Sequence, residues 1–341
     1  MRRLMRIAAI AILLALVAHP GAVQQTQPAV LIPTHGIAFS SYVTGYDPIH
    51  GPHPAPELVD SLMQRVRAMG FRRILVYGVT AGFDPVYEAA ERYGLQVIAI
   101  IWLDHVVADQ ASIAAGIQRA KAQPKTIERL SCGSEVRTRH GVAAAEAAIR
   151  DCLTQVRAAG VSQPVGSIDS WWGWCNEAWP CQDWGLAADV DWIGVNIYPW
   201  WENKYSGLFP CTPADEAAAF TVARYQAMRE QYAGKDVLLT EFGWPAGPDG
   251  YTETNRYTQQ QCGVASPANQ HLVVEQTLAA LDAAGLPGIV FEAFHEPWKA
   301  SAEGPVGAHW GVCSGEAPYT CPFAYGMRER AFLPLLLTGR Q

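Results

Sequence analysis

Two glutamates at the ends of apolar runs carry the clearest chemical signal in the sequence. Glu241, in LTEFGWP, follows the apolar residues 237–239, and Glu135 stands in CGSEVRTRHG, 106 residues earlier. A carboxylate at the end of a buried strand is costly unless it is solvated, paired or used in a reaction. Two carboxylates that flank a sugar can cleave a glycosidic bond, because one protonates the leaving oxygen while the other attacks the anomeric carbon or directs water to it.

The predicted elements that must position these glutamates alternate between strands and helices. Short apolar runs alternate with windows whose apolar residues recur every three or four positions, which is the pattern of βα units. The predicted strands are 36–40, 73–77, 96–101, 129–132, 165–168, 192–196, 237–240 and 288–291. The predicted helices are 57–69, 83–93, 110–122, 142–159, 214–232 and 269–284. Between the fifth and sixth strands we expect a Trp- and Cys-rich loop, 171–184, and a short piece near Leu186.

Eight strands with intervening helices predict an α/β fold, a single (β/α)8 TIM barrel with long loops at its C-terminal face. A doubly wound open sheet is the alternative, but no Gly-rich phosphate loop follows any predicted strand. Reactive groups of such a barrel lie at the C-terminal ends of its strands. Glu135 ends the fourth predicted strand and Glu241 the seventh, so both can reach one cleft. Either glutamate alone could be a solvated strand-end residue.

The composition argues against several other classes of function. The chain has 341 residues, half of them hydrophobic, a formal net charge of -7, and no Lys/Arg cluster beyond its first six residues, so we expect no nucleic-acid partner. No CxxC pair and no HExxH sequence occur, so we expect no metal, and we expect no cofactor either. The sequence also lacks the G-x-S-x-G elbow of an esterase.

The first 22 residues have the layout of a secretory signal peptide. Three arginines within the first six residues precede an apolar run at 7–18, which ends before Pro20. An uncleaved membrane anchor is the alternative, because Pro20 occupies a position where cleavage favours a small residue. We expect a signal peptide at 1–22 and a catalytic domain at 30–341, in a secreted, periplasmic or cell-envelope monomer without a membrane span in its mature form.

All eight cysteines follow Ser131, and their number fits disulfide bonding in an oxidising compartment. Two pairs lie close enough in sequence to close single loops, namely Cys175 with Cys181 and Cys313 with Cys321. The other four could form two longer links, and the connectivity stays open, because eight cysteines permit about 105 pairings. These four are Cys132, Cys152, Cys211 and Cys262.

Four ordered motifs resemble glycoside hydrolase family 17, which contains β-1,3-glucanases and β-1,3-glucanosyltransferases. They are GSEVRTR at 133–139, IGVNIYPWW at 193–201, LTEFGWP at 239–245 and FEAFHEPWK at 291–299. The resemblance extends upstream through GIAFSSY at 36–42, ILVYG at 74–78 and GLQVIAIIWLD at 94–104. The resemblance is strongest to the bacterial and fungal cell-wall branch of the family, and it covers nearly the whole mature chain.

This resemblance implies a role for several residues. It makes Glu135 the acid/base and Glu241 the nucleophile, puts Tyr198 beside the nucleophile, and places Glu292 and Lys299 on the glycone side of the cleft. For Lys299 the alternative is an exposed loop ion pair with little effect on stability.

Further substrate contacts are predicted near the strand ends. Ser134 stands where the wider clan usually has an asparagine that contacts the sugar 2-hydroxyl, and its hydroxyl has a shorter reach. The chain has 12 Trp, many of them after strand ends, where an indole ring can cover the apolar face of a pyranose; ordinary packing is the alternative for each. The predicted contacts also include Tyr77, Asn196, Trp172, Trp200, Trp244 and Trp298.

The resulting hypothesis is a secreted retaining enzyme that hydrolyses β-1,3-glucan through a covalent glycosyl-enzyme. Transfer of the glucosyl unit to another sugar, by the same residues, is the first alternative, because acceptor geometry decides which acceptor resolves the intermediate. A non-catalytic glucan-binding protein is the second.

Overall fold

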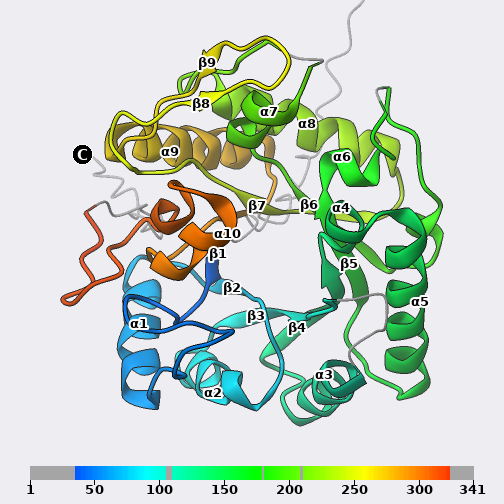
Figure 1. Ribbon diagram of the computed structural model, residues 1–341. Helices are drawn as coiled ribbons and strands as arrows, with labels where there is room; N and C mark the ends of the chain where they lie inside the picture. Colours follow the sequence, from blue (N-terminus) through cyan, green and yellow to red (C-terminus); the bar gives the residue numbers. More distant parts are fainter. Residues whose placement is uncertain (1–34, 105–109, 179, 208–209, 323–341) are drawn as a thin grey trace, which may run out of the picture. The chain divides into compact units, whose positions relative to one another are not determined.

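The computed structural model describes residues 35–104, 110–178, 180–207 and 210–322 (Figure 1). The predicted signal peptide, 1–22, lies outside the described residues. Within the described ranges, no helix combines the length and the apolar character needed to cross a membrane.

Eight parallel strands form a closed barrel, which confirms the predicted fold. Each strand pairs with its neighbour in the chain, and the last pairs with the first through Gly36 opposite Ile289, so the open-sheet alternative is wrong. The observed ends differ from the predicted ones by two residues or fewer. The barrel strands are β1 (Gly36–Phe39), β2 (Arg73–Val76), β3 (Gln96–Ile101), β4 (Ile127–Ser134), β5 (Val165–Ser170), β6 (Trp192–Asn196), β7 (Asp236–Phe242) and β10 (Gly288–Val290).

Six long helices surround the barrel, each close to its predicted range (Figure 1). Their buried faces share one hydrophobic cluster with side chains of the strands, for example Val66 of the first helix with Ile37 and Val76. These helices are α1 (Pro56–Ala68), α2 (Asp84–Arg92), α3 (Gln110–Ala122), α5 (Val142–Ala158), α8 (Ala217–Gln231) and α9 (Pro267–Ala284).

The sequence analysis missed the short elements that follow the C-terminal ends of the strands. They are too short to show a helical or strand period, so sequence periodicity cannot reveal them. They are α4 (Val136–His140) after β4, α6 (Trp171–Trp174) after β5, α7 (Pro199–Tyr205) after β6, the hairpin β8 (Glu253–Thr254) and β9 (Gln261–Cys262) after β7, and α10 (Ala300–Glu303) after β10.

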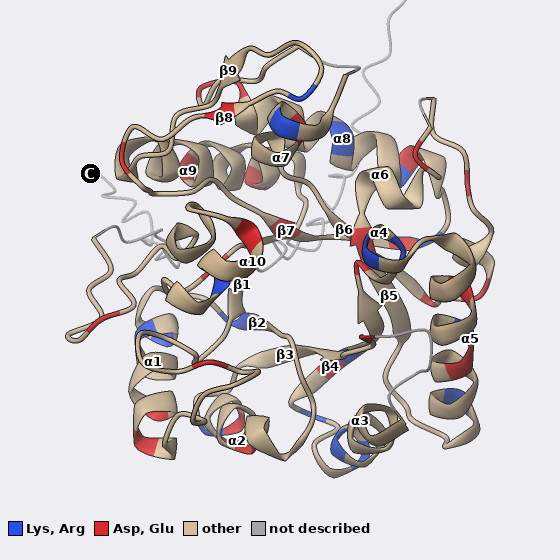
Figure 2. Cartoon of the chain, in the orientation of Figure 1, with Lys and Arg blue, Asp and Glu red and all other residues tan. Residues whose placement is uncertain are grey.

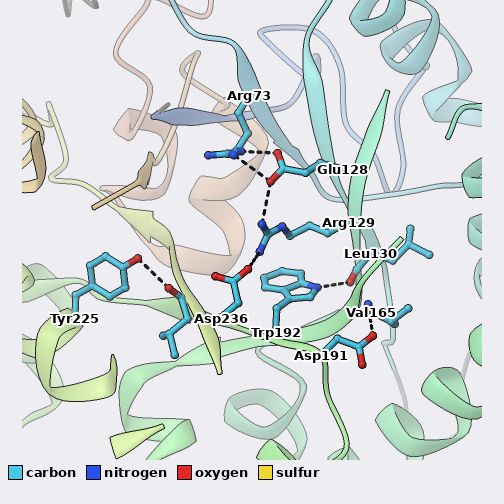
Figure 3. Close-up of polar contacts among 10 residues, drawn as sticks. Arg73, Glu128, Arg129, Leu130, Val165, Asp191, Trp192, Tyr225 and Asp236 are labelled. Atoms are coloured by element: carbon cyan, nitrogen blue, oxygen red, sulfur yellow. Dashed lines mark hydrogen bonds and ion pairs between the residues drawn. The ribbon is translucent and has the colours of Figure 1, made fainter. Parts of the chain in front are cut away.

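The N-terminal end of the barrel is closed by a layer of paired charges (Figure 3). Arg73 donates from Nε and from a terminal nitrogen to the carboxylate of Glu128, at 2.7 and 3.0 Å. Arg129 donates to Glu128 at 3.0 Å and to Asp236 at 2.8 Å, and its guanidinium carbon lies 5.1 Å from the centroid of the buried Trp192 ring. This end of the barrel is therefore filled by groups that bind one another.

Four disulfides join all eight cysteines, and both predicted short-range pairs are present. The two pairs that the sequence left open tie β4 to α5 and the segment before α8 to β9. The disulfides are Cys132–Cys152, Cys175–Cys181, Cys211–Cys262 and Cys313–Cys321.

Replacing Arg129 by alanine should lower the free energy of unfolding by about 1–3 kcal/mol, because Asp236 and Glu128 both lose a partner and the cation leaves the Trp192 ring. Urea denaturation followed by tryptophan fluorescence measures the change. The side chain of Arg129 is 14% exposed, whereas that of Arg150, which also pairs with two acids, is 47% exposed. Arg150→Ala is thus the matched control and should change stability by less than about 0.5 kcal/mol; equal losses would contradict the structural role of the layer.

Candidate active site

Glu241, near the end of β7, lies at the C-terminal mouth of the barrel and is 5% exposed. Tyr77, which follows β2, donates its hydroxyl to Oε1 at 2.8 Å, and Tyr198, which follows β6, donates to Oε2 at 2.7 Å. Gly243, two residues after Glu241, allows the chain after β7 to come close to Phe291, since a Cβ on Gly243 would lie 2.4 Å from the carbonyl oxygen of Phe291. Side chains from three strand ends thus meet around one carboxyl group.

Glu135 directly follows β4 and has a left-handed backbone, with φ 53° and ψ 29°. Asn196, the last residue of β6, donates from Nδ2 to Glu135 Oε1 at 2.9 Å. The Thr240 hydroxyl donates to Asn196 Oδ1 at 2.8 Å and so fixes the orientation of the amide. Because Asn196 pairs with Glu241 in the β6–β7 register, one amide connects the surroundings of both predicted catalytic residues.

The two carboxyl groups lie in a common electrostatic environment. Burial and, next, the charge of Glu135 raise the pKa of Glu241 to about 8, against the lowering effect of the Tyr198 and Tyr77 hydroxyls and of Lys299. Burial also raises the pKa of Glu135, and the hydrogen bond from Asn196 and the charge of Arg139 oppose that rise. Burial thus disfavours the ionised form of both carboxyl groups.

A buried cluster of Glu292, Glu296 and Lys299 lies on the predicted glycone side. The Lys299 ammonium bonds Glu292 and lies 2.5 Å from Glu296, and both carboxylates raise its pKa although desolvation alone would lower it. All three residues are buried, so the alternative of an exposed loop ion pair is wrong. Glu292 Oε1 is buried and has no hydrogen-bond donor among the described residues.

The four predicted tryptophans divide into two groups. Trp172 and Trp298 are half-buried, and Trp298 Nε1 has no protein partner among the described residues. Trp200 and Trp244 are fully buried and pack edge to face, with ring centroids 5.1 Å apart. A sugar contact is therefore the wrong prediction for Trp200 and Trp244, because each indole covers the other beneath the β8–β9 hairpin. Sugar contacts of Trp172 and Trp298 stay predictions.

The mouth contains further residues that the sequence analysis did not assign to the site. Trp310 packs on Tyr198, with ring centroids 5.3 Å apart, and Trp102 follows β3 with the Arg139 guanidinium 4.5 Å from its ring centroid. Glu303 of α10 lies close enough for its charge to raise the pKa of Glu135. Figure 2 shows acidic positions on β7 and α10 and basic positions on α4 around this end. The position of Trp102 directly after a predicted strand could have indicated that it lies at the mouth. No feature of the sequence indicated this for Glu303.

Ser134 is buried at the end of β4, and its carbonyl oxygen accepts a hydrogen bond from Arg139 at 3.0 Å. The structure therefore brings Ser134, Asn196, Tyr77 and Tyr198 together with the two glutamates at one end of the barrel. Their contacts with a substrate stay predictions.

Residues 36–311 match the BtgE/BtgC glycoside hydrolase domain family. The chain is 24% identical to a glucan 1,3-β-glucosidase of Arthroderma benhamiae over 68% of this chain and 72% of that protein. It is 25% identical to the cell surface mannoprotein MP65 of Candida albicans over 72% of this chain, which spans only 59% of the Candida protein.

Among solved structures, a glycoside hydrolase family 17 β-1,3-glucanosyltransferase from Rhizomucor miehei is similar in fold. The TM-score is 0.62 at 18% identity, and the alignment covers 84% of this chain and 97% of that one. The domain match covers the barrel strands and the loops that carry the two glutamates. The chain therefore belongs to the BtgE/BtgC glycoside hydrolase domain family and, with it, to glycoside hydrolase family 17.

Proposed function

We propose that this chain cleaves β-1,3-glucan with retention of configuration, with Glu241 as nucleophile and Glu135 as acid/base. The observation that carries the proposal is the pair of buried carboxyls at the barrel mouth, one held by two tyrosine hydroxyls and the other by the amide of Asn196. The names of the relatives support the glucan as substrate, and the family supports glycosidic chemistry.

The proposed reaction has two steps. A Glu241 oxygen attacks the anomeric carbon and forms a glycosyl ester, while the bond to the leaving oxygen breaks and Glu135 transfers its proton to that oxygen. In the second step Glu135 takes a proton from water, the water oxygen bonds the anomeric carbon, and the ester bond to Glu241 breaks. If a sugar hydroxyl replaces water, the same residues perform glucosyl transfer.

The surrounding groups match the charge changes of these steps. Burial raises the pKa of Tyr77 and Tyr198 well above the ordinary value, so both hydroxyls stay protonated and can donate to Glu241. These bonds, and the charge of Lys299, favour the ionised nucleophile and a carboxylate leaving group in the second step. Glu292 Oε1 and Trp298 Nε1 are buried without a hydrogen-bond partner among the described residues, and we infer that sugar hydroxyls on the glycone side complete them.

We also propose that the protein acts outside the cytoplasm, in the cell envelope or as a secreted enzyme. Four disulfides support an oxidising compartment, and one relative is named as a cell-surface protein.

Incubation of the purified protein with defined β-1,3-gluco-oligosaccharides, followed by mass spectrometry, tests the reaction directly. Shorter products indicate hydrolysis, and longer products indicate transfer. Binding without any product, across a range of pH values, would overturn the catalytic proposal in favour of a glucan-binding protein.

Glu241→Ala should reduce turnover by more than about 10⁴-fold, because the covalent route needs this carboxylate. Hydrolysis rates on a soluble β-1,3-glucan measure the loss, and unchanged circular dichroism and glucan affinity show that the fold persists. Glu88→Ala, at an exposed position of α2, is the control and should keep full activity. Undiminished turnover in Glu241→Ala would refute the nucleophile assignment.

Glu135→Gln should lower the pKa of Glu241, because the negative charge of Glu135 is one of the causes that raise it. A 2-deoxy-2-fluoro laminaribioside with a dinitrophenyl leaving group labels only the ionised nucleophile and needs no acid. Its rate of covalent labelling should rise with pH through about 8 in the unchanged protein and through a lower midpoint in the variant. An identical midpoint would mean that the two carboxyls do not interact.

Tyr198→Phe should raise the pKa of Glu241 further and reduce kcat by about tenfold or more, because the carboxylate loses a hydroxyl donor. Tyr225→Phe is the matched control, since the buried Tyr225 hydroxyl donates to the Val237 carbonyl at 3.0 Å, on the same strand but at its opposite end. The pH profile of labelling and the steady-state rate measure both effects. A shift of equal size in the control would assign the change to strand stability instead.

A further inference from the structure

The segment that carries Glu135 is tied to the end of β5 by three hydrogen bonds. The Glu135 N–H donates to the Ile168 carbonyl at 2.8 Å. The Arg137 N–H donates to Asp169 Oδ2 at 3.0 Å, and the Thr138 hydroxyl donates to Asp169 Oδ1 at 2.6 Å. The carboxylate of Asp169 therefore accepts from two of the first residues of α4, immediately after the predicted acid/base.

The Asp169 side chain is buried and is bound by protein donors. It is 1% exposed, and the Ser170 N–H also donates to Oδ1 at 2.8 Å. A Cβ on Gly173 would lie 2.3 Å from Oδ1, so the first turn of α6 covers the carboxylate closely. Both of its oxygens thus accept from protein donors.

We propose that Asp169 is a positioning residue, which holds the left-handed backbone of Glu135 so that its carboxyl faces Asn196 and the leaving oxygen. This inference rests on the proposed role of Glu135.

The physical reason lies in the backbone of Glu135. A left-handed conformation is strained for a residue with a side chain, so the segment relaxes unless the surroundings hold it. Hydrogen bonds to an ionised carboxylate are about twice as strong as neutral ones. The two bonds from α4 can therefore outweigh the local cost, and an error of about 1 Å in a catalytic group can reduce the rate about 100-fold.

The charged groups that face Asp169 come from the Glu135 segment. Burial and, next, the charge of Glu135 raise the pKa of Asp169 to about 6, and the bonds from Thr138, Ser170 and Arg137 oppose the rise. Asp169 in turn acts on the guanidinium of Arg139. Asp169 is hence ionised above about pH 6, and its bonds to α4 are strongest there.

Asp169→Asn tests the proposal, because the amide keeps the shape of the side chain but offers one acceptor oxygen where two are needed.

Two substrates distinguish a loss of Glu135 positioning from a general loss of stability. Laminari-oligosaccharides need a proton from Glu135 on the leaving oxygen, whereas dinitrophenyl β-laminaribioside releases a stable phenolate and needs none. We expect kcat/KM to fall about 100-fold on the oligosaccharides and by less than about threefold on the aryl glycoside. Azide can replace water in the second step without a base, so it should raise kcat of the variant on the aryl glycoside.

Asp191→Asn is the matched control. Asp191 precedes β6, and its Oδ2 accepts from the backbone N–H of Val165 at 2.9 Å, at the opposite end of β5 (Figure 3), so the control makes the same substitution at a carboxylate that binds the same strand. It should change kcat/KM on both substrates by less than about threefold, even if it lowers stability. If Asp169→Asn does not fold, Thr138→Val should give the same selective loss, and Thr138→Ser, which keeps the hydroxyl, should restore the rate.

Equal losses on both substrates, or loss without azide rescue, would overturn the inference and leave Asp169 with a structural role only. Failure of the proposed function is a separate result, since in that case the unchanged protein would turn over neither substrate.

Discussion

The structure depends most on the desolvation of a carboxyl group at the mouth of the barrel. Glu241 is nearly inaccessible to solvent, and its buried charge is compensated by the hydroxyls of Tyr77 and Tyr198 and by the ammonium of Lys299. These partners come from the loops after β2, β6 and β10, so the barrel must close for the site to exist. The same burial that makes the charge costly also strengthens every interaction with a developing charge during the proposed reaction.

The two ends of the barrel use buried polar groups in opposite ways. At the N-terminal end, Arg73, Glu128, Arg129 and Asp236 bind one another around the Trp192 ring. At the C-terminal end the polar groups are incompletely satisfied by the described protein, and Glu292 Oε1 lacks a donor. Each charged group at the N-terminal end has a partner of opposite charge, although Arg129 Nε has no acceptor among the described residues, whereas an unsatisfied buried oxygen at the mouth can be completed by a ligand.

The short elements after the strands give the two predicted catalytic residues different supports. Glu241 lies within a barrel strand, and its neighbours on β6 and β10 fix its backbone. Glu135 lies just beyond β4, so its left-handed backbone depends on its own N–H bond to Ile168 and on the bonds of α4 to Asp169. The proposed acid/base is therefore held by a local hydrogen-bond network, and the proposed nucleophile by the sheet itself.

The sequence alone determined the barrel, the six long helices and the strand-end positions of Glu135 and Glu241, because apolar periodicity and length suffice to predict buried strands and amphipathic helices. It also determined the two short-range disulfides. Only the tertiary structure decided that Trp200 and Trp244 pack on each other, that Lys299 is buried between two acids, and that Asp169 holds the segment after Glu135. These outcomes depend on which side chains meet across strands distant in the chain, and local sequence carries no record of such contacts.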